Sequence, residues 1–168
     1  MDTLYFHSKS IDKKVGEGKN EYINNCNDYI ELDKIIDWRR ILSNFYIAPF
    51  RFNNLTFNTV EHAFQYSKIN LVNPNIAFNF CLESNSDLSK SDGLIARKNR
   101  KIIILNTSQL YQWNQIKNNI LENILLQKFT QNSLPKKVLL LTNNAILTHS
   151  IRTKPIRQIE LENVRKLL

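Results

Sequence analysis

The sequence predicts an α+β fold: a predominantly helical single domain over residues 1–168 with a small antiparallel sheet. Apolar residues recur at helical spacing from Leu110 to Phe129, over about five turns. The Asn53-Asn54 pair separates two short apolar runs, as in a β-hairpin. With 42% hydrophobic and 10% aromatic residues, a chain of 168 residues can bury one core.

The N-terminal half predicts a strand, a long loop, a weak helix and a hairpin. Leu4–Ser8 alternates in polarity and predicts the strand. Residues 9–30 are polar and predict the loop; loops of that length are usually functional or mobile. Tyr29–Arg40 has a weak helical period. Asn tolerates positive φ, so Asn53-Asn54 predicts the turn of the hairpin.

A second helix is predicted to begin after Thr59, a good N-cap residue. Glu61, Gln65 and Lys68 follow at positions i, i+4 and i+7, so they line one polar stripe of this helix. Unpaired amides and the helix dipole favour a carboxylate in the first turn. The stripe therefore places a carboxylate and an amine on one face, either as reactive groups beside a pocket or as the solvated edge of an amphipathic helix.

The second half of the chain predicts further helices and one strand. The elements expected are a short buried helix over Ile76–Leu82, the long helix capped by Thr107 or Ser108, a helix from Ser133 to Asn143 with Pro135 in its first turn, a strand over Ala145–Ser150 and a helix over Arg157–Leu168.

The net charge and the cysteines limit the kinds of partner and the cellular compartment that we expect. Lys and Arg outnumber Asp and Glu by 23 to 15, a formal charge of +8 that favours a phosphate-bearing partner. The two cysteines lie far apart and outside any CxxC pattern, so neither a disulfide framework nor a zinc site is expected. No apolar run is long enough to span a membrane and no signal-peptide pattern is visible, so we expect a cytoplasmic protein.

Several motifs occur together in a characteristic order. They are Leu42-Ser43-Asn44-Phe45-Tyr46 with Ala48-Pro49-Phe50, Thr59 to Gln65 with Lys68, Gly93, Trp113, Lys128-Phe129 and the segment from Leu141 to Leu147. In these motifs the chain resembles the NADAR family, the YbiA-like N-glycosidases, from about Phe6 to the C-terminus. Thr148-His149-Ser150 stands where many members carry a Glu, which indicates a branch with a basic closing segment.

The resemblance implies cleavage of an N-glycosidic bond between a ribose and a base. Substrates of similar proteins are phosphorylated ribosylaminopyrimidines of riboflavin synthesis, or ADP-ribose attached to a target such as guanine in nucleic acid. We expect no metal and no organic cofactor, since Glu61-His62 is not part of an HExxH pattern and the three histidines are scattered. No membrane association and no obligate protein partner are indicated by the sequence. The alternative from another class is a non-catalytic module that binds ADP-ribose or nucleic acid, which the charge of +8 would serve equally well.

The resemblance also suggests roles for individual residues. Glu61 would stabilise positive charge at the sugar carbon and activate water, unless it only complements the helix dipole. Lys68 would hold a phosphate or attack an opened ribose aldehyde, unless it is a surface lysine. Substrate-binding roles, each weighed against an ordinary structural one, fall on Ser43, Asn44, Phe45, Gly93, Trp113, His149, Arg152 and Arg157.

Overall fold

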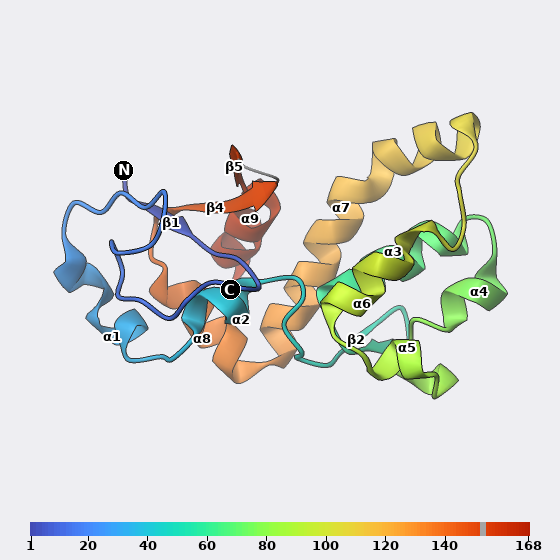
Figure 1. The fold of residues 1–168 in the computed structure, drawn as a ribbon, viewed down its shortest axis with the longest axis horizontal. Coiled ribbons are helices and arrows are strands. Elements are labelled where there is room, and N and C mark those ends of the chain that lie inside the picture. Colours follow the sequence, from blue (N-terminus) through green and yellow to red (C-terminus); the bar gives the residue numbers. More distant parts are fainter. Residues whose placement is uncertain (152–153) are drawn as a thin grey trace. The chain divides into compact units, whose positions relative to one another are not determined.

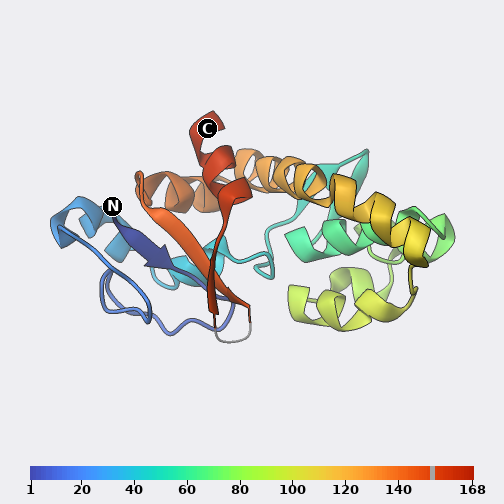
Figure 2. The same cartoon turned by 90° about the horizontal axis from the view of Figure 1, so that it is seen from above.

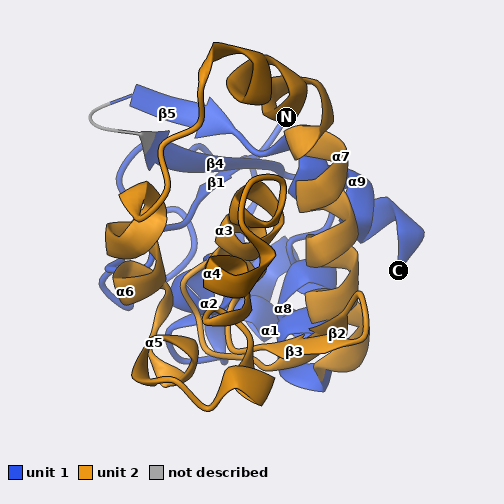
Figure 3. Cartoon of the chain, turned by 90° about the vertical axis from the view of Figure 1, so that its right-hand side faces the viewer, with its two compact units in different colours: residues 1–43, 133–168 blue, residues 44–132 orange. Residues whose placement is uncertain are grey.

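The structure, a computed structural model, describes residues 1–151 and 154–168. The chain divides into two compact units, residues 1–43 with 133–168 (unit 1) and residues 44–132 (unit 2), coloured separately in Figure 3. Helices predominate and the strands are few, so the predicted α+β class is confirmed (Figure 1). A single domain over residues 1–168 stays a prediction, which calorimetric unfolding in one transition would test.

Unit 1 contains a three-stranded sheet with short helices. Its elements are β1 (Thr3–Tyr5), the 3-10 helix η1 (Cys26–Tyr29), α1 (Ile30–Asp33), α2 (Trp38–Leu42), α8 (Ser133–Leu141), β4 (Ile146–Ile151), β5 (Lys154–Arg157) and α9 (Ile159–Leu167). The strand order is β1-β4-β5, with β4 and β5 antiparallel (Figure 2). The predicted sheet was antiparallel, but β1 pairs with β4 in parallel. The long chain between these two strands provides the crossover that parallel strands need.

The weak helical period over Tyr29–Arg40 becomes two helices, α1 and α2. The break falls at Asp37, which adopts φ 58°, a left-handed conformation that Asp tolerates better than most residues. The amide of Asp37 also donates to Oδ1 of Asp12 at 3.0 Å, which fixes the break. The sequence pattern missed β5, since Pro155 argues against a central strand, but β5 is an edge strand, where proline is tolerated.

Unit 2 holds the hairpin and the longest helix. Its elements are β2 (Phe50–Phe52), β3 (Leu55–Phe57), α3 (Val60–Asn70), α4 (Pro74–Phe78), the 3-10 helix η2 (Leu82–Ser84), α5 (Asp87–Lys90), α6 (Gly93–Lys98), the 3-10 helix η3 (Asn99–Lys101) and α7 (Thr107–Gln131). Asn53 and Asn54 have φ of 51° and 63° between the antiparallel strands β2 and β3. Two positive φ values are what a two-residue hairpin turn requires, so the predicted hairpin is confirmed.

Side chains form hydrogen bonds with main-chain groups on both outer edges of this hairpin. The side-chain amide of Gln131 accepts from Arg51 N–H at 2.7 Å and donates to Arg51 C=O at 2.9 Å. On the other edge, the Glu83 carboxylate accepts from Thr56 N–H at 2.8 Å and 2.9 Å. Both outward-facing main-chain groups of Arg51 and the outward-facing amide of Thr56 therefore have partners within unit 2.

The ends of α3 and α7 follow capping rules. Thr59 caps α3 as predicted, since its hydroxyl accepts from His62 N–H at 3.3 Å. The cap of α7 is Asn106 and not the predicted Thr107 or Ser108. Asn106 and Gln109 exchange two side-chain to main-chain bonds of 2.9 Å, and such a capping box favours Asn106 over a single hydroxyl cap.

The remaining predicted elements agree with the structure apart from their ends. The helix expected over Ile76–Leu82 is α4, which begins two residues earlier because Asn73 caps it and Pro74 takes its first position. It also ends four residues earlier than predicted, at Phe78. Within unit 2, α3 packs against α4, α6 and α7, around the buried residues Ile69, Phe80 and Ala96. Among the helices that the structure describes, none combines the length and apolar character needed to cross a bilayer.

Candidate functional site

Glu61 lies in the first turn of α3 and is only 4% exposed. Its Oε1 accepts a hydrogen bond of 2.8 Å from Nε2 of Gln65, one turn later, and lies 3.5 Å from a guanidinium nitrogen of Arg97 on α6. Its Oε2 receives no hydrogen bond from any residue within 1–151 and 154–168. The carboxylate is thus held through one oxygen, which leaves the other to meet a ligand atom.

Gln65 adds an unsatisfied acceptor beside this carboxylate. Its side chain is buried, and its Oε1 has no hydrogen-bond partner in the described part of the chain. Because native structures rarely leave a buried polar atom unpaired, the Oε1 atom is positioned to accept from a bound group. The sequence placed Gln65 on the polar stripe with Glu61 but gave it no role.

Lys68 completes the stripe two turns after Glu61. Its Nζ donates to the main-chain oxygen of Arg100 at 2.9 Å, and the side chain is partly buried. Burial lowers the pKa of the Lys68 amine, the charges of Arg97 and Arg100 lower it further, and the negative charge of Glu61 opposes them. The carboxylate, the amine and two guanidinium groups therefore act on one another electrostatically.

Arg97 is one of 23 lysine and arginine residues in the chain, and its place beside Glu61 results from packing between helices. The helical spacing within α3 predicts that Glu61 and Lys68 share a face, but nothing local indicates which arginine α6 brings to that face. The Arg97 side chain is half exposed while that of Glu61 is buried, so the guanidinium lies where the carboxylate meets solvent.

His62, adjacent to Glu61, has a structural role. Its Nδ1 lies 2.8 Å from Oγ1 of Thr59 and its Nε2 lies 2.9 Å from the main-chain oxygen of Leu88. Burial lowers the pKa of this fully buried histidine, which favours the neutral imidazole. The side chain of Asn58 likewise donates to the main-chain oxygens of Lys90 and Ser91, so these contacts fix the start of α3 against the segment before α6.

The loop at Asn44 and Phe45 joins the same region. The main-chain oxygen of Asn44 accepts from Glu61 N–H at 3.1 Å, and that of Phe45 accepts from Gly93 N–H at 3.4 Å. A Cβ atom added to Gly93 would lie 2.3 Å from Cα of Phe45, a severe clash. Gly93 thus permits close approach of the protein's own loop. Among the predicted site residues, the structure brings together Asn44, Phe45, Glu61 and Gly93, with Lys68 at the far end of the stripe.

Trp113 and Lys128 are both buried on α7. The Trp113 ring contacts that of Phe64 with centroids 5.0 Å apart, in the packing of α3 against α7. This position favours the core role of Trp113 over stacking on a base. Burial lowers the pKa of Lys128 to about 7, and its Nζ lies 4.8 Å from the Phe129 ring centroid and 5.7 Å from that of Tyr46.

The other predicted binding residues belong to unit 1. Ser43 is buried at the end of α2 and its amide donates to the main-chain oxygen of Arg40. The His149 ring on β4 stacks on the His7 ring at 5.3 Å. Arg157 forms an ion pair of 2.8 Å with Glu162. Arg152 lies outside the described residues.

The fold and this site define an α+β protein that carries a buried carboxylate and a partly buried amine on one helix. The chain belongs to the NADAR family, since the profile described as NADAR domain matches residues 35–156. The NMR structure of the E. coli protein YbiA has a similar fold, with a TM-score of 0.56 and 18% sequence identity over 77% of this chain and 75% of that one. A comparison with curated proteins found none that matches this sequence.

Proposed function

We propose that this protein is an N-glycosidase that hydrolyses the bond between ribose and base in a phosphorylated nucleoside-like or ADP-ribosylated substrate. The observation that carries the proposal is the buried Glu61 carboxylate, whose Oε1 contacts Gln65 and Arg97. Its Oε2 receives no hydrogen bond from the residues that the structure describes. Membership in the NADAR family and the fold shared with YbiA support it.

The chemistry proposed for Glu61 follows from the charge that develops during cleavage. As the bond from the sugar carbon to nitrogen breaks, the carbon gains positive charge and the base leaves with the bonding electrons. A fixed carboxylate stabilises that charge, and its second oxygen accepts a proton from the water that adds to the carbon. The displaced base takes up a proton, so the products are the free base and the free sugar.

The cations beside Glu61 suit the phosphorylated part of such a substrate. Arg97 is half exposed and Lys68 is partly buried, so both can contact a phosphate group. The lowered pKa of Lys68 also raises the fraction of neutral amine, which can attack the aldehyde of an opened ribose and form a Schiff base with loss of water. Both free cysteines, Cys26 and Cys81, suit the proposed cytoplasmic setting, where thiols stay reduced.

The test compares the wild-type protein with Glu61→Gln, which keeps the size of the side chain and an acceptor for Gln65. Glu31→Gln, which changes an exposed carboxylate on α1, is the matched control. Each protein receives an oligonucleotide with ADP-ribosylated guanine and, separately, a ribosylaminopyrimidine phosphate, and products are identified by mass spectrometry. We expect Glu61→Gln to lose at least about 100-fold in turnover with little change in substrate binding.

The two substrates distinguish the two versions of the proposal. Release of ADP-ribose from the first makes the protein an ADP-ribosyl hydrolase, and release of ribose 5-phosphate from the second places it in small-molecule metabolism. Binding without product from either substrate, in wild type and variant alike, would replace the glycosidase by a non-catalytic binding module.

A further inference from the structure

Unit 1 contains a cavity of about 200 Å³ that no step of the proposed reaction uses. Its lining residues come from β1, the loop that follows it and α2; they are Tyr5, His7, Lys9, Ser10, Ile11, Lys13, Gly18, Lys19 and Arg39. All of them except Arg39 precede residue 35, where the match to the NADAR domain begins. The cavity is therefore largely a feature of the N-terminal loop of this chain.

The cavity is lined by positive charge without a carboxylate to balance it. None of Lys9, Lys13 and Lys19 forms an ion pair with an acidic side chain of the residues described. Two acidic residues of the same loop, Asp12 and Glu17, do not line the cavity. Three lysines that line one small volume concentrate positive charge there, and a bound anion would balance that charge.

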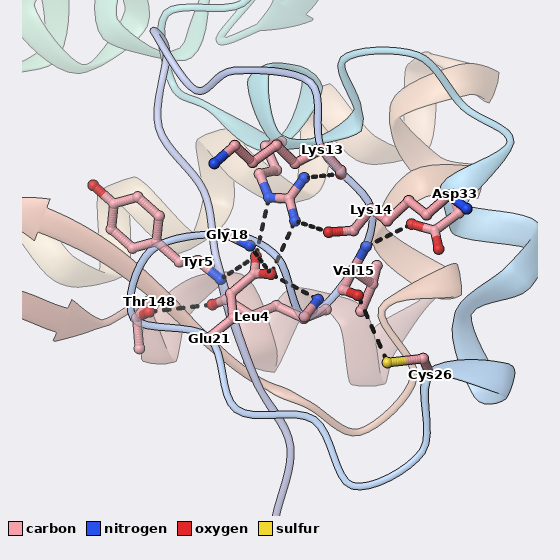
Figure 4. Close-up of polar contacts among 12 residues, drawn as sticks. Leu4, Tyr5, Lys13, Lys14, Val15, Gly18, Glu21, Cys26, Asp33 and Thr148 are labelled. Carbon is pink, nitrogen blue, oxygen red and sulfur yellow. Dashed lines mark hydrogen bonds and ion pairs between the residues drawn. The ribbon is translucent and has the colours of Figure 1, made fainter.

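A buried ion pair between Glu21 and Arg39 fixes the loop segment that carries Lys13 and Gly18, two of the residues that line the cavity. The Glu21 carboxylate is fully buried and accepts from Arg39 at 2.9 Å and 3.0 Å. It also accepts from the main-chain amides of Tyr5, Gly16 and Gly18, which Figure 4 shows for Tyr5 and Gly18. The charge of Glu21 is already balanced by Arg39 in this ion pair, so the positive charge of the lysines remains in excess.

The same ion pair fixes the backbone that carries Lys13. The Arg39 guanidinium donates to the main-chain oxygens of Lys13 and Lys14, and it stacks 4.2 Å over the Trp38 ring. Removing one partner of a buried ion pair leaves the other charge buried and unpaired, which strongly destabilises the folded state. The loop is thus a fixed framework, and a fixed framework lowers the entropy cost of binding a ligand.

Further hydrogen-bond donors line the cavity. Nδ1 of His7 accepts from the Lys9 amide at 3.1 Å, which leaves the ring proton on Nε2 as a donor. The hydroxyl of Ser10 is buried and lacks a hydrogen-bond partner in the residues described, while Arg40 fixes the Ser10 main-chain oxygen at 2.8 Å. With three ammonium groups, an imidazole N–H and a hydroxyl, the cavity offers chiefly donors.

We propose that this cavity is a binding site for the phosphate or diphosphate group of a small molecule. A phosphate group presents several acceptor oxygens and negative charge to the donors described, and lysine and a fixed loop are common means of binding it. The Tyr5 ring and the Ile11 side chain give the cavity an apolar part as well, which suits a substituent on the phosphate. The cavity residues belong to unit 1 and Glu61 belongs to unit 2, and anion binding in the cavity does not rest on the glycosidase proposal.

The test is calorimetric titration of the full chain with inorganic pyrophosphate at constant ionic strength. Lys13→Gln/Lys19→Gln removes two cavity charges, and Lys117→Gln/Lys137→Gln removes two positive charges from α7 and α8, outside the cavity. We expect saturable binding with one site per chain, weakened roughly tenfold or more in the first double variant and little in the second. All four lysines are wholly or partly solvent-exposed, and thermal unfolding would verify that both variants fold.

Three results would overturn the proposal. Equal weakening in both double variants would mean that net charge alone attracts the anion. Loss of binding in Glu61→Gln would assign the anion to the other site. Tighter binding of a thymidine oligonucleotide, which carries phosphodiesters, would indicate a nucleic-acid surface in place of a small-molecule site. Unchanged pyrophosphate affinity in Glu61→Gln is the expected result, whether or not that variant retains activity.

Discussion

Gly93 and Phe45 approach each other so closely that a Cβ atom at position 93 would lie 2.3 Å from the Phe45 Cα atom. The contact joins the start of α6 to the loop whose Asn44 carbonyl accepts from the Glu61 amide. A single missing methyl group at position 93 therefore controls how the loop, α6 and the carboxylate are positioned.

We predict that Gly93→Ala lowers the free energy of unfolding by about 1–3 kcal/mol, because the new methyl group must displace main-chain atoms. Turnover by the proposed glycosidase is expected to fall as well, since α6 carries Arg97. Urea unfolding and the product assay check both effects. Ile95→Ala, at an exposed position of the same helix, is the control, and equal behaviour of the two variants would refute the prediction.

We also predict that Lys68 reacts with sugar aldehydes more readily than surface lysines do near neutral pH. Its pKa is lowered by burial, and each unit of decrease makes the neutral amine about tenfold more abundant. Incubation with ribose 5-phosphate and cyanoborohydride, followed by peptide mapping, measures the adduct at each lysine. Lys117, near the middle of α7, is the internal reference.

The pH dependence of this labelling is the sharper part of the prediction. Labelling at Lys68 should reach its maximum at lower pH than labelling at an ordinary lysine. Lys68→Arg should abolish the adduct and leave the labelling of Lys117 unchanged. Identical pH profiles at the two lysines would exclude a Schiff-base role and leave Lys68 as a phosphate contact.

Burial lowers the pKa of Lys128 to about 7 in the folded protein, whereas its pKa in the unfolded chain is about 10.5. Between these values the unfolded chain binds more protons, so this lysine makes stability rise with pH from about 7 to 10.5. We expect Lys128→Met to be more stable than wild type near pH 7, by on the order of 1–4 kcal/mol. The advantage should shrink towards pH 10.

Urea unfolding at pH 7 and near pH 10 measures this difference. Other titrating groups are common to both proteins, so the change in the difference between them isolates Lys128. Lys117→Met on the same helix should show no such change, because this lysine is not buried. A constant difference between Lys128→Met and wild type at both pH values would contradict the prediction.

Much of unit 2 was predictable because its signals are local. The Thr59 cap, the Asn53-Asn54 turn and the spacing of Glu61, Gln65 and Lys68 each depend on neighbouring residues. The pairing of Arg97 with Glu61 was not predictable, because it depends on how α6 packs against α3.

In unit 1, too, elements set by neighbouring residues were predictable, whereas contacts between distant residues were not. The strand at β4 and the helix α9 were predicted from their own residues. The ion pair of Glu21 and Arg39 joins positions 18 residues apart, across a loop without a periodic pattern. In unit 2, the burial of Lys128 was missed, because the sequence does not distinguish a lysine at a buried helix position from a solvated one.

The hairpin of β2 and β3 has a consequence for self-association. A two-stranded sheet ordinarily offers unpaired main-chain groups on both sides, which a strand of a second molecule can join. Here the side chain of Gln131 pairs with the outward-facing N–H and C=O of Arg51, and that of Glu83 accepts from the outward-facing N–H of Thr56. These two side chains therefore hinder a strand of a second molecule from joining either edge of the hairpin.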